Sequence, residues 1–437
     1  MRSFKTYQAE PILVAILVVT LFSTCVVAQE ETASSRDEPV VHSIKDKIGL
    51  SGSIRFGYWS STRNLDGEQP IGSAMLWVKA NHQLSSRFSY FADGWLASRG
   101  PVDKGESRVE GREAYIELKT DRFELRVGRQ IFAWGRADAI NPTANLSGED
   151  LTLLTPETED RKRGTTAIRG RYFLHSLSIT GVWLPEFRPV RFPFPNPPTG
   201  ETYLQDYRRW PADQFAFRVE QTGSTVDWSV SYFDGFDLLP DLAPAKASND
   251  FDAIKLSHHR IRVIGADMAT NIGHYGLRAE GSYTSTEDSS HRDPFIKNPY
   301  VFAVLGGDRT YRGELNVNLQ YLLRVVIDYT ALPNGGRGPT NVLAEQEAVI
   351  SDQAERVEHG MSTRISNKWL HETLEAEFAA VTYFSPKGVL VRPKIAYSVT
   401  DHWKLVIGGE LLRGDKRSVF GLLRQNSVSY CETRYSF

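Results

Sequence analysis

The chain has 437 residues, of which 41% are hydrophobic and 11% aromatic, and its mean hydropathy is −0.35. An α-helical membrane protein would be more apolar, whereas a barrel whose strands meet lipid with every second residue fits these values. With 51 basic and 53 acidic residues the net charge is −2, so the charge balance gives no sign of a nucleic-acid partner or a polybasic membrane patch.

The first 28 residues have the pattern of a secretory signal peptide. Arg2 and Lys5 precede an apolar run from Ile12 to Val27, and small residues stand where a signal peptidase cuts. We expect cleavage after Ala28, with an uncleaved anchor helix and a lipid-modified Cys25 as the alternatives. Cleavage would leave Cys431 as the only cysteine, so we expect no internal disulfide.

Residues 29–47 are polar and charged without periodicity, and we expect them to form a short periplasmic lead. From residue 48 onward, apolar and polar residues alternate in segments of roughly ten residues, a period that sends neighbouring side chains to opposite faces of a strand. The predicted strands are 48–59, 72–83, 87–98, 110–119, 122–132, 164–173, 176–184, 214–221, 224–234, 259–270, 274–284, 300–309, 314–326, 357–366, 371–383, 388–399, 403–413 and 425–437.

Short and long connections alternate between these segments. Turn-forming pairs such as Ser85–Ser86, Thr120–Asp121 and Thr222–Gly223 fill the short connections. The long connections are 99–109, 133–163, 185–213, 235–258, 285–299 and 327–356. This alternation is typical of outer-membrane barrels, which have short periplasmic turns and long extracellular loops.

The predicted fold class is therefore all-β, with residues 48–437 forming a transmembrane antiparallel barrel of 16 to 18 strands. A closed barrel is required because hydrocarbon offers the backbone no hydrogen-bond partner, so every strand must pair with its neighbours. An even strand count places both ends of the barrel in the periplasm.

The alternation also predicts which side chains face the lumen. An Arg or Lys that faces lipid at the bilayer centre costs about 2–4 kcal/mol, so the charged positions of each strand should point inward. The expected lumen-facing residues are Glu124, Arg126, Arg278, Glu280, Asn316, Asn318, Gln320, Arg392 and Lys394. Pro393 cannot donate a hydrogen bond to the ladder, which predicts a local irregularity.

A stiff, arginine-containing loop follows the predicted strand 176–184. Prolines and phenylalanines surround Arg188 and Arg191 in the segment 185–198, and Arg208 and Arg209 follow it. If this loop folds inward, its guanidinium groups would narrow the pore and favour anionic solutes. The alternative is an exterior loop that covers the mouth of the barrel.

Two further segments carry weaker signals. Residues 340–356 have the apolar spacing of a short helix, either extracellular or folded inward. His258 and His259 are adjacent, so a regular strand would point them to opposite faces and they could not hold one metal ion together. The sequence contains no HExxH motif and no cysteine cluster, and we expect no cofactor.

The C-terminal strand supplies an independent signal. It ends on Phe437 with Tyr435 two residues earlier, which resembles the C-terminal signature by which the barrel-assembly machinery recognises bacterial outer-membrane proteins. The resemblance implies that Phe437 contacts this machinery.

A longer motif lies at the end of the predicted strand 122–132. Gly128-Arg129-Gln130 is followed by Trp134-Gly135, then Asp138, then Asn141-Pro142. This pattern looks like an uncharacterised porin-like family of Gram-negative outer-membrane barrels and, more distantly, the alginate-export porins. Supporting matches are Gly306-Gly307-Asp308, Asn316, Asn318, Gln320, the region Gly409 to Gly414, Phe420 and Gly421.

These observations predict a channel in the bacterial outer membrane through which small hydrophilic solutes pass passively, rather than an enzyme. Its partners would be outer-membrane lipids, the solutes and the assembly machinery, and a homo-oligomer is compatible with the sequence. The alternatives are a barrel enzyme of lipase or protease type and the barrel component of an export or electron-transfer complex.

Overall fold

A computed structural model describes residues 48–61, 71–99, 107–194, 202–206, 212–223, 225–246, 251–288, 292–311, 314–331 and 339–437. The expected signal peptide 1–28 and lead 29–47 lie outside the described residues, so both remain predictions. No helix in the described ranges is long and apolar enough to cross a membrane.

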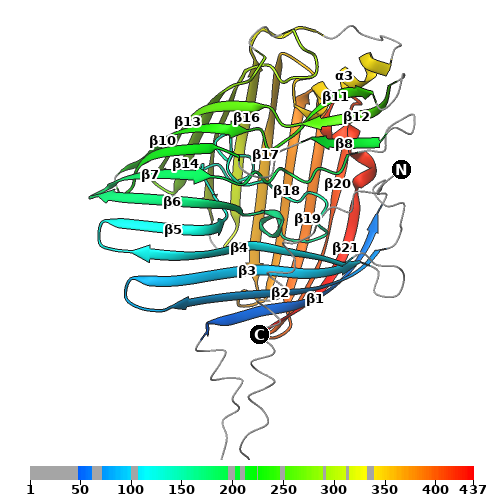
Figure 1. The fold of residues 1–437 in the computed structure, drawn as a ribbon. Helices are drawn as coiled ribbons and strands as arrows, with labels where there is room; N and C mark the ends of the chain where they lie inside the picture. The colour runs from blue at the N-terminus through cyan, green and yellow to red at the C-terminus, as the bar shows by residue number, and fades with distance from the viewer. Residues whose placement is uncertain are drawn as a thin grey trace, which may run out of the picture.

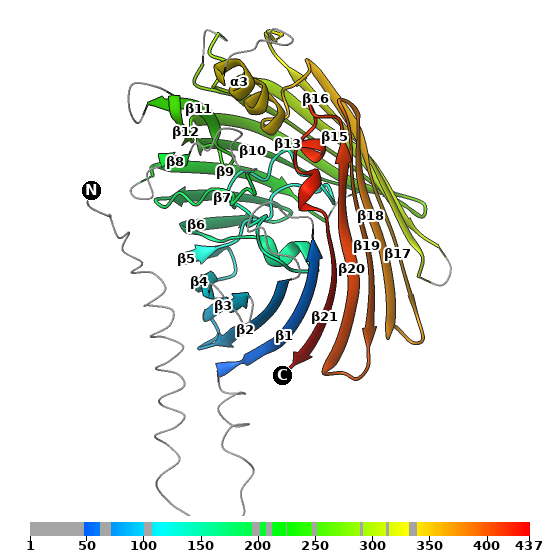
Figure 2. The ribbon, with the colours of Figure 1, turned by 90° about the vertical axis from the view of Figure 1, so that its right-hand side faces the viewer.

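Eighteen strands form a single sheet in which neighbours run antiparallel, and the sheet closes on itself (Figures 1 and 2). The prediction of a closed antiparallel barrel is confirmed, at the upper end of the expected strand count. The strands are β1 (Leu50–Ser61), β2 (Ile71–Gln83), β3 (Phe88–Arg99), β4 (Ser107–Lys119), β5 (Phe123–Gln130), β6 (Thr165–Leu174), β7 (Leu177–Leu184), β9 (Gln214–Gln221), β10 (Val226–Phe236), β13 (Arg260–Ile272), β14 (Tyr275–Ser285), β15 (Tyr300–Thr310), β16 (Asn316–Val326), β17 (Val357–Trp369), β18 (Leu374–Ser385), β19 (Lys387–Ser398), β20 (Trp403–Gly414) and β21 (Val428–Ser436).

The first and last strands close the barrel. β1 pairs with β21 from Ser53 opposite Ser436 to Ser61 opposite Val428. Beyond that ladder, Phe437 donates its backbone N–H to the oxygen of Gly52 at 3.0 Å, and Gly52 donates its own to the oxygen of Phe437 at 3.1 Å. The final residue of the chain is therefore part of the closing seam.

Burial alternates along the strands as the sequence predicts. In β16 the side chains of Asn318 and Gln320 are 5% and 2% exposed, whereas those of Leu319 and Tyr321 are 45% and 44% exposed. The apolar residues thus form the outer surface of the barrel, which is the arrangement that lipid requires.

The strand boundaries differ from the prediction in a few places. β21 begins at Val428 rather than at residue 425, because Arg424–Asn426 form a short 3-10 helix, η2. Between β19 and β20 the register is Val391 opposite Leu411 and Lys394 opposite Gly408, and the ladder is interrupted at the two positions between them. This interruption contains Pro393, where the sequence predicts an irregularity.

The long extracellular connections fold into a second small unit that the sequence does not reveal. Strands β8 (Thr202–Asp206), β12 (Phe251–Ser257) and β11 (Asp241–Lys246) form a separate sheet beside helix α3 (Pro339–Ile350), at the end of the barrel opposite the termini of the described chain (Figure 1). We call this sheet, α3 and residues 292–299 the cap. The predicted helix at 340–356 corresponds to α3.

Two shorter helices complete the described chain. η1 (Thr158–Arg161) lies in the connection between β5 and β6, and α4 (Val419–Leu422) lies between β20 and β21.

Candidate functional site

The connection between β5 and β6, residues 131–164, lies inside the barrel, and we call it the inner loop. Its residues form hydrogen bonds or ion pairs with β1, β4, β9, β13, β14, β16, β19 and β20. A loop outside the barrel could reach only the strands on its own side. Contacts on opposite walls therefore require this loop to cross the lumen, as Figure 2 shows.

A single carboxylate on β14 holds the first part of the inner loop. Glu280 Oε2 accepts the backbone N–H of Arg136 at 2.8 Å and of Ala137 at 3.0 Å, and Oε1 accepts the N–H of Thr143 at 2.9 Å and its hydroxyl at 2.8 Å. Gly135 has φ +93°, and a Cβ there would lie 2.5 Å from Glu280 Oε1. The site therefore needs a glycine for both its backbone conformation and this close approach.

Charged side chains of the same segment bond to three more strands. Arg136 Nε donates to Asp267 on β13 at 2.7 Å, and its Nη2 donates to Glu220 on β9 at 3.0 Å. Asp138 accepts from Arg278 on β14 at 2.9 Å and from the amide of Asn318 on β16. The segment from Gly135 to Thr143 is thus fixed to the wall formed by β9 to β16.

The second part of the inner loop is bound to the opposite wall. Three ion pairs hold it: Asp160 with Arg55 of β1 at 2.5 Å, Arg161 with Glu410 of β20 at 2.6 Å, and Glu157 with Lys394 of β19 at 3.0 Å. Arg112 of β4 also donates to the backbone oxygens of Glu159 and Lys162. Because both ends of the loop are anchored, it divides the lumen.

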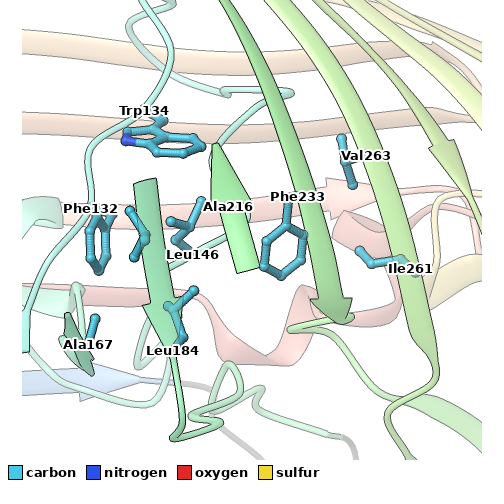
Figure 3. Close-up of a cluster of buried hydrophobic side chains, with 10 residues drawn as sticks. Phe132, Trp134, Leu146, Ala167, Leu184, Ala216, Phe233, Ile261 and Val263 are labelled. Atoms are coloured by element: carbon cyan, nitrogen blue, oxygen red, sulfur yellow. The ribbon is translucent and has the colours of Figure 1, made fainter. Parts of the chain in front are cut away.

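Apolar packing reinforces these polar anchors. Phe132, Trp134 and Leu146 of the inner loop are buried against the inward side chains of five strands, Val182 and Leu184 of β7 among them (Figure 3). The guanidinium of Arg218 lies 5.6 Å from the centre of the Trp134 ring. Side chains therefore fill this part of the lumen.

One section of wall carries no such bond. No hydrogen bond or ion pair within the described ranges joins the inner loop to β17 or β18, which lie between β16 and β19. Arg364 on β17 faces this section with a side chain that is 53% exposed, and it pairs with Glu377 on β18 at 2.6 Å. Across from it, the side chains of Asp138 and Glu157 are 32% and 29% exposed.

Two of the four predicted constriction arginines, Arg188 and Arg191, contact the second part of the inner loop. Arg188 is 8% exposed and pairs with Glu110 on β4, and its Nη1 donates to the oxygen of Gly164 at 2.6 Å. Arg191 has a side chain that is 41% exposed and pairs with Asp150 at 2.9 Å. Arg208 and Arg209 lie outside the described residues. The role of these arginines in a constriction remains a prediction. Arg191 is better placed than Arg188 to contact a solute, because its side chain is exposed whereas Arg188 is buried.

The nine residues predicted to face the lumen fall into two groups by their bonding partners. Arg278, Glu280, Asn318, Gln320 and Lys394 bond to the inner loop. The remaining four bond to neighbouring wall residues: Glu124 to Arg169, Arg126 to Glu117, Arg392 to Glu410, and Asn316 to Thr310.

The sequence indicates only part of this arrangement. From the sequence alone, Asp150, Glu157, Glu159 and Asp160 could pair with Arg161, Lys162 and Arg163, and of these pairs the structure has Glu159 with Lys162, at 2.8 Å. Arg136 is not singled out in advance, because its partners come from two distant strands. The one sequence signal for this anchoring segment is the motif Trp134-Gly135, followed by Arg136 and Asp138.

No group of three or more His, Cys, Asp or Glu residues in the described part of the chain could hold a metal ion.

No family model matches the chain, and no curated protein matches it. Solved structures do share its fold. OpdL of Pseudomonas aeruginosa superposes with a TM-score of 0.51 and 14% identity, covering 89% of this chain and 97% of that one. OccAB1 of Acinetobacter baumannii gives 0.51 and 10%, covering 89% and 96%. OccK11 (OpdR) of Pseudomonas aeruginosa gives 0.51 and 11%, covering 89% and 94%.

These neighbours are outer-membrane porins. The resemblance to a porin-like barrel is thus supported at the level of fold. The likeness to alginate-export porins is not tested by these structures and stays a prediction.

Proposed function

We propose that the protein is an outer-membrane channel through which small hydrophilic solutes pass passively. An 18-stranded barrel is wide enough to leave an aqueous channel, and the inward side chains here are polar and charged. The fold shared with outer-membrane porins supports the same location for this chain. In this proposal the mature protein starts after Ala28, and the barrel-assembly machinery recognises Phe437.

The observation that carries the proposal is the unbonded wall section at β17 and β18. Ala137 and Ile140 of the loop share an apolar cluster with Val381 and Tyr383 of β18, but no ion pair or hydrogen bond in the described ranges crosses to β17 or β18. We therefore place the narrowest aperture beside this apolar contact, between the loop and Arg364. Asp138 and Glu157 supply negative charge on the loop side, and Arg364 supplies positive charge on the wall. Opposed charges across an aperture orient a polar solute and replace part of its hydration.

Reconstituting the purified protein in planar bilayers tests this placement. Arg364→Gln removes the most exposed cation of the aperture, so the reversal potential in a salt gradient should shift toward cation selectivity. We expect the permeability ratio to change roughly two- to tenfold, corresponding to about 0.4–1.4 kcal/mol of lost attraction for anions. Arg122→Gln, in the exposed turn between β4 and β5, is the control for net charge and should leave the ratio unchanged.

Arg191→Gln provides a second comparison, because its side chain is exposed but lies behind the loop. A shift smaller than that of Arg364→Gln supports the aperture at β17 and β18. Equal shifts in the Arg364→Gln and Arg122→Gln variants would contradict this placement, and a folded barrel that passes no current would contradict the channel itself.

A further inference from the structure

The cap reaches across the extracellular mouth of the barrel. Leu242 and Leu256 of its sheet pack in one buried cluster with Leu343 of α3, and Phe192 packs against that cluster. Phe192 also packs against a second cluster that contains Leu390 and Leu412, which lie on β19 and β20. The cap thus connects the side of the mouth near β10 and β13 with the opposite side.

A buried ion cluster lies where the parts of the cap meet. Lys297 is 5% exposed, and its Nζ lies 3.0 Å from Asp237 Oδ2, 2.9 Å from Asp241 Oδ1 and 2.7 Å from the backbone oxygen of Leu239. Asp241 Oδ2 lies 2.5 Å from Nδ1 of His259. One ammonium therefore serves two carboxylates that are themselves shielded from water.

Helix α3 is attached to the same place through Glu347, which is 3% exposed. Its Oε2 accepts the backbone N–H of Leu242 at 2.5 Å, directly after Asp241, and its Oε1 accepts the hydroxyl of Ser351. A carboxylate buried this deeply depends on its hydrogen bonds and on the nearby ammonium.

The cluster joins three connections that are far apart along the chain. The connection between β10 and β13 contributes Asp237, Asp241 and His259. The connection between β14 and β15 contributes Lys297, and the connection between β16 and β17 contributes Glu347. Each connection returns to the barrel independently, so they can separate without breaking any barrel ladder. Lys297 is the residue whose removal leaves two buried carboxylates without their shared cation.

We propose that Lys297 and its partners form a latch that holds the cap closed over the extracellular mouth, and that the pore opens when the latch is released. This inference rests on the proposed channel function. The latch differs from the aperture because it controls access to the lumen, whereas the inner loop sets the width within it.

The first test compares Lys297→Met with Lys416→Met. Methionine keeps the length of the lysine side chain but removes the ammonium, and Lys416 is exposed without an ion pair in the described ranges. Single-channel records should show several-fold more open time for Lys297→Met than for the control. Amide hydrogen exchange in residues 241–246 should accelerate roughly tenfold or more, while exchange in the barrel strands is unchanged.

A second test needs no loss of charge and remains informative if Lys297→Met fails to fold. Leu242→Cys and Leu343→Cys, in a Cys431→Ser background, place one thiol on each side of the interface between β11 and α3. Oxidation to the disulfide should lower the open time, and reduction should restore it.

The outcomes separate the two proposals. Equal open times and exchange rates in Lys297→Met and Lys416→Met, or equal currents in the oxidised and reduced double-cysteine protein, would overturn the latch while the channel stands. A complete lack of conductance in the wild type and all variants would overturn both.

Discussion

The inner loop and the segment 185–194 differ in how far their charges reach. The inner loop joins β5 to β6 and the segment 185–194 follows β7, and both carry arginines that pair with carboxylates. Arg136 of the inner loop bonds to β9 and β13, whereas Arg188 of the other segment bonds to β4 and to the end of the inner loop at Gly164. One connection crosses the lumen, and the other supports it from behind.

The difference teaches that the path of a loop depends on the wall that it faces. Aromatic residues, prolines and arginines make 185–198 the more conspicuous candidate for a constriction. The inner loop crosses instead because Glu280 offers two oxygens to four donors of a loop that Gly135 allows to approach closely. Two experiments test this comparison, and a third tests the electrostatics of the cap.

The largest effect should come from Glu280→Gln. An amide can present only one oxygen to the four donors of Arg136, Ala137 and Thr143, so two of them lose their acceptor, at a cost of about 2–4 kcal/mol. We expect the segment 135–143 to leave the wall and the single-channel conductance to rise. Glu375→Gln is the matched control, because the Glu375 carboxylate also lies on the barrel wall but pairs with Lys404 of β20, at 3.9 Å, instead of with the inner loop. Equal conductance in the two variants would show that Glu280 does not hold the loop.

Arg188→Met should act on stability rather than on selectivity. The substitution leaves Glu110 without its hydrogen-bond donor, although Arg191 still lies 3.3 Å from that carboxylate. We expect about 1–3 kcal/mol of destabilisation, measured by urea unfolding of the protein in detergent. Its reversal potential should match that of the wild type. An altered reversal potential with unchanged stability would instead place Arg188 at the constriction that the sequence predicts.

The smallest effect should be a pH dependence confined to the cap. Burial lowers the pKa of His258 to about 4, and its Nδ1 lies 2.7 Å from the backbone oxygen of Asp237. Because the closed cap keeps this imidazole neutral, its contribution is complete above the ordinary pKa of 6.5 and is lost as the pH falls toward 4.

His259 has the opposite sign. Its hydrogen bond with Asp241 raises its pKa, so its contribution is lost as the pH rises through that raised value. After correction for the intrinsic pH dependence of exchange, the protection of amides in residues 241–246 should be highest near neutral pH, and His258→Phe should remove only its loss on the acid side. Removal of the pH dependence on both sides in that variant would contradict the separate assignment.

The barrel strands could be predicted because a period of two is visible in any single strand. β16 shows this plainly, with amides at 316, 318 and 320 and apolar residues between them. The strands of the cap are different. β11 contains Pro244, and β8 pairs in parallel with β12, a partner far along the chain. Short strands with distant partners leave no local pattern to recognise.

The anchors of the inner loop escape prediction for a related reason. Lys394 and Glu157 are both visible as charged residues, but 237 positions separate them, and only the closed barrel brings them together. A single sequence reports the charge of each residue and not the identity of its partner.

The pairing of β1 with β21 has a consequence for biogenesis. Until β21 pairs with β1, the sheet has two unpaired edges, and each can form hydrogen bonds with another extended chain. The edges must therefore be kept from pairing with other chains before the barrel closes. A C-terminal tag that displaces Phe437 from Gly52 would interfere with the closure of the β1–β21 seam.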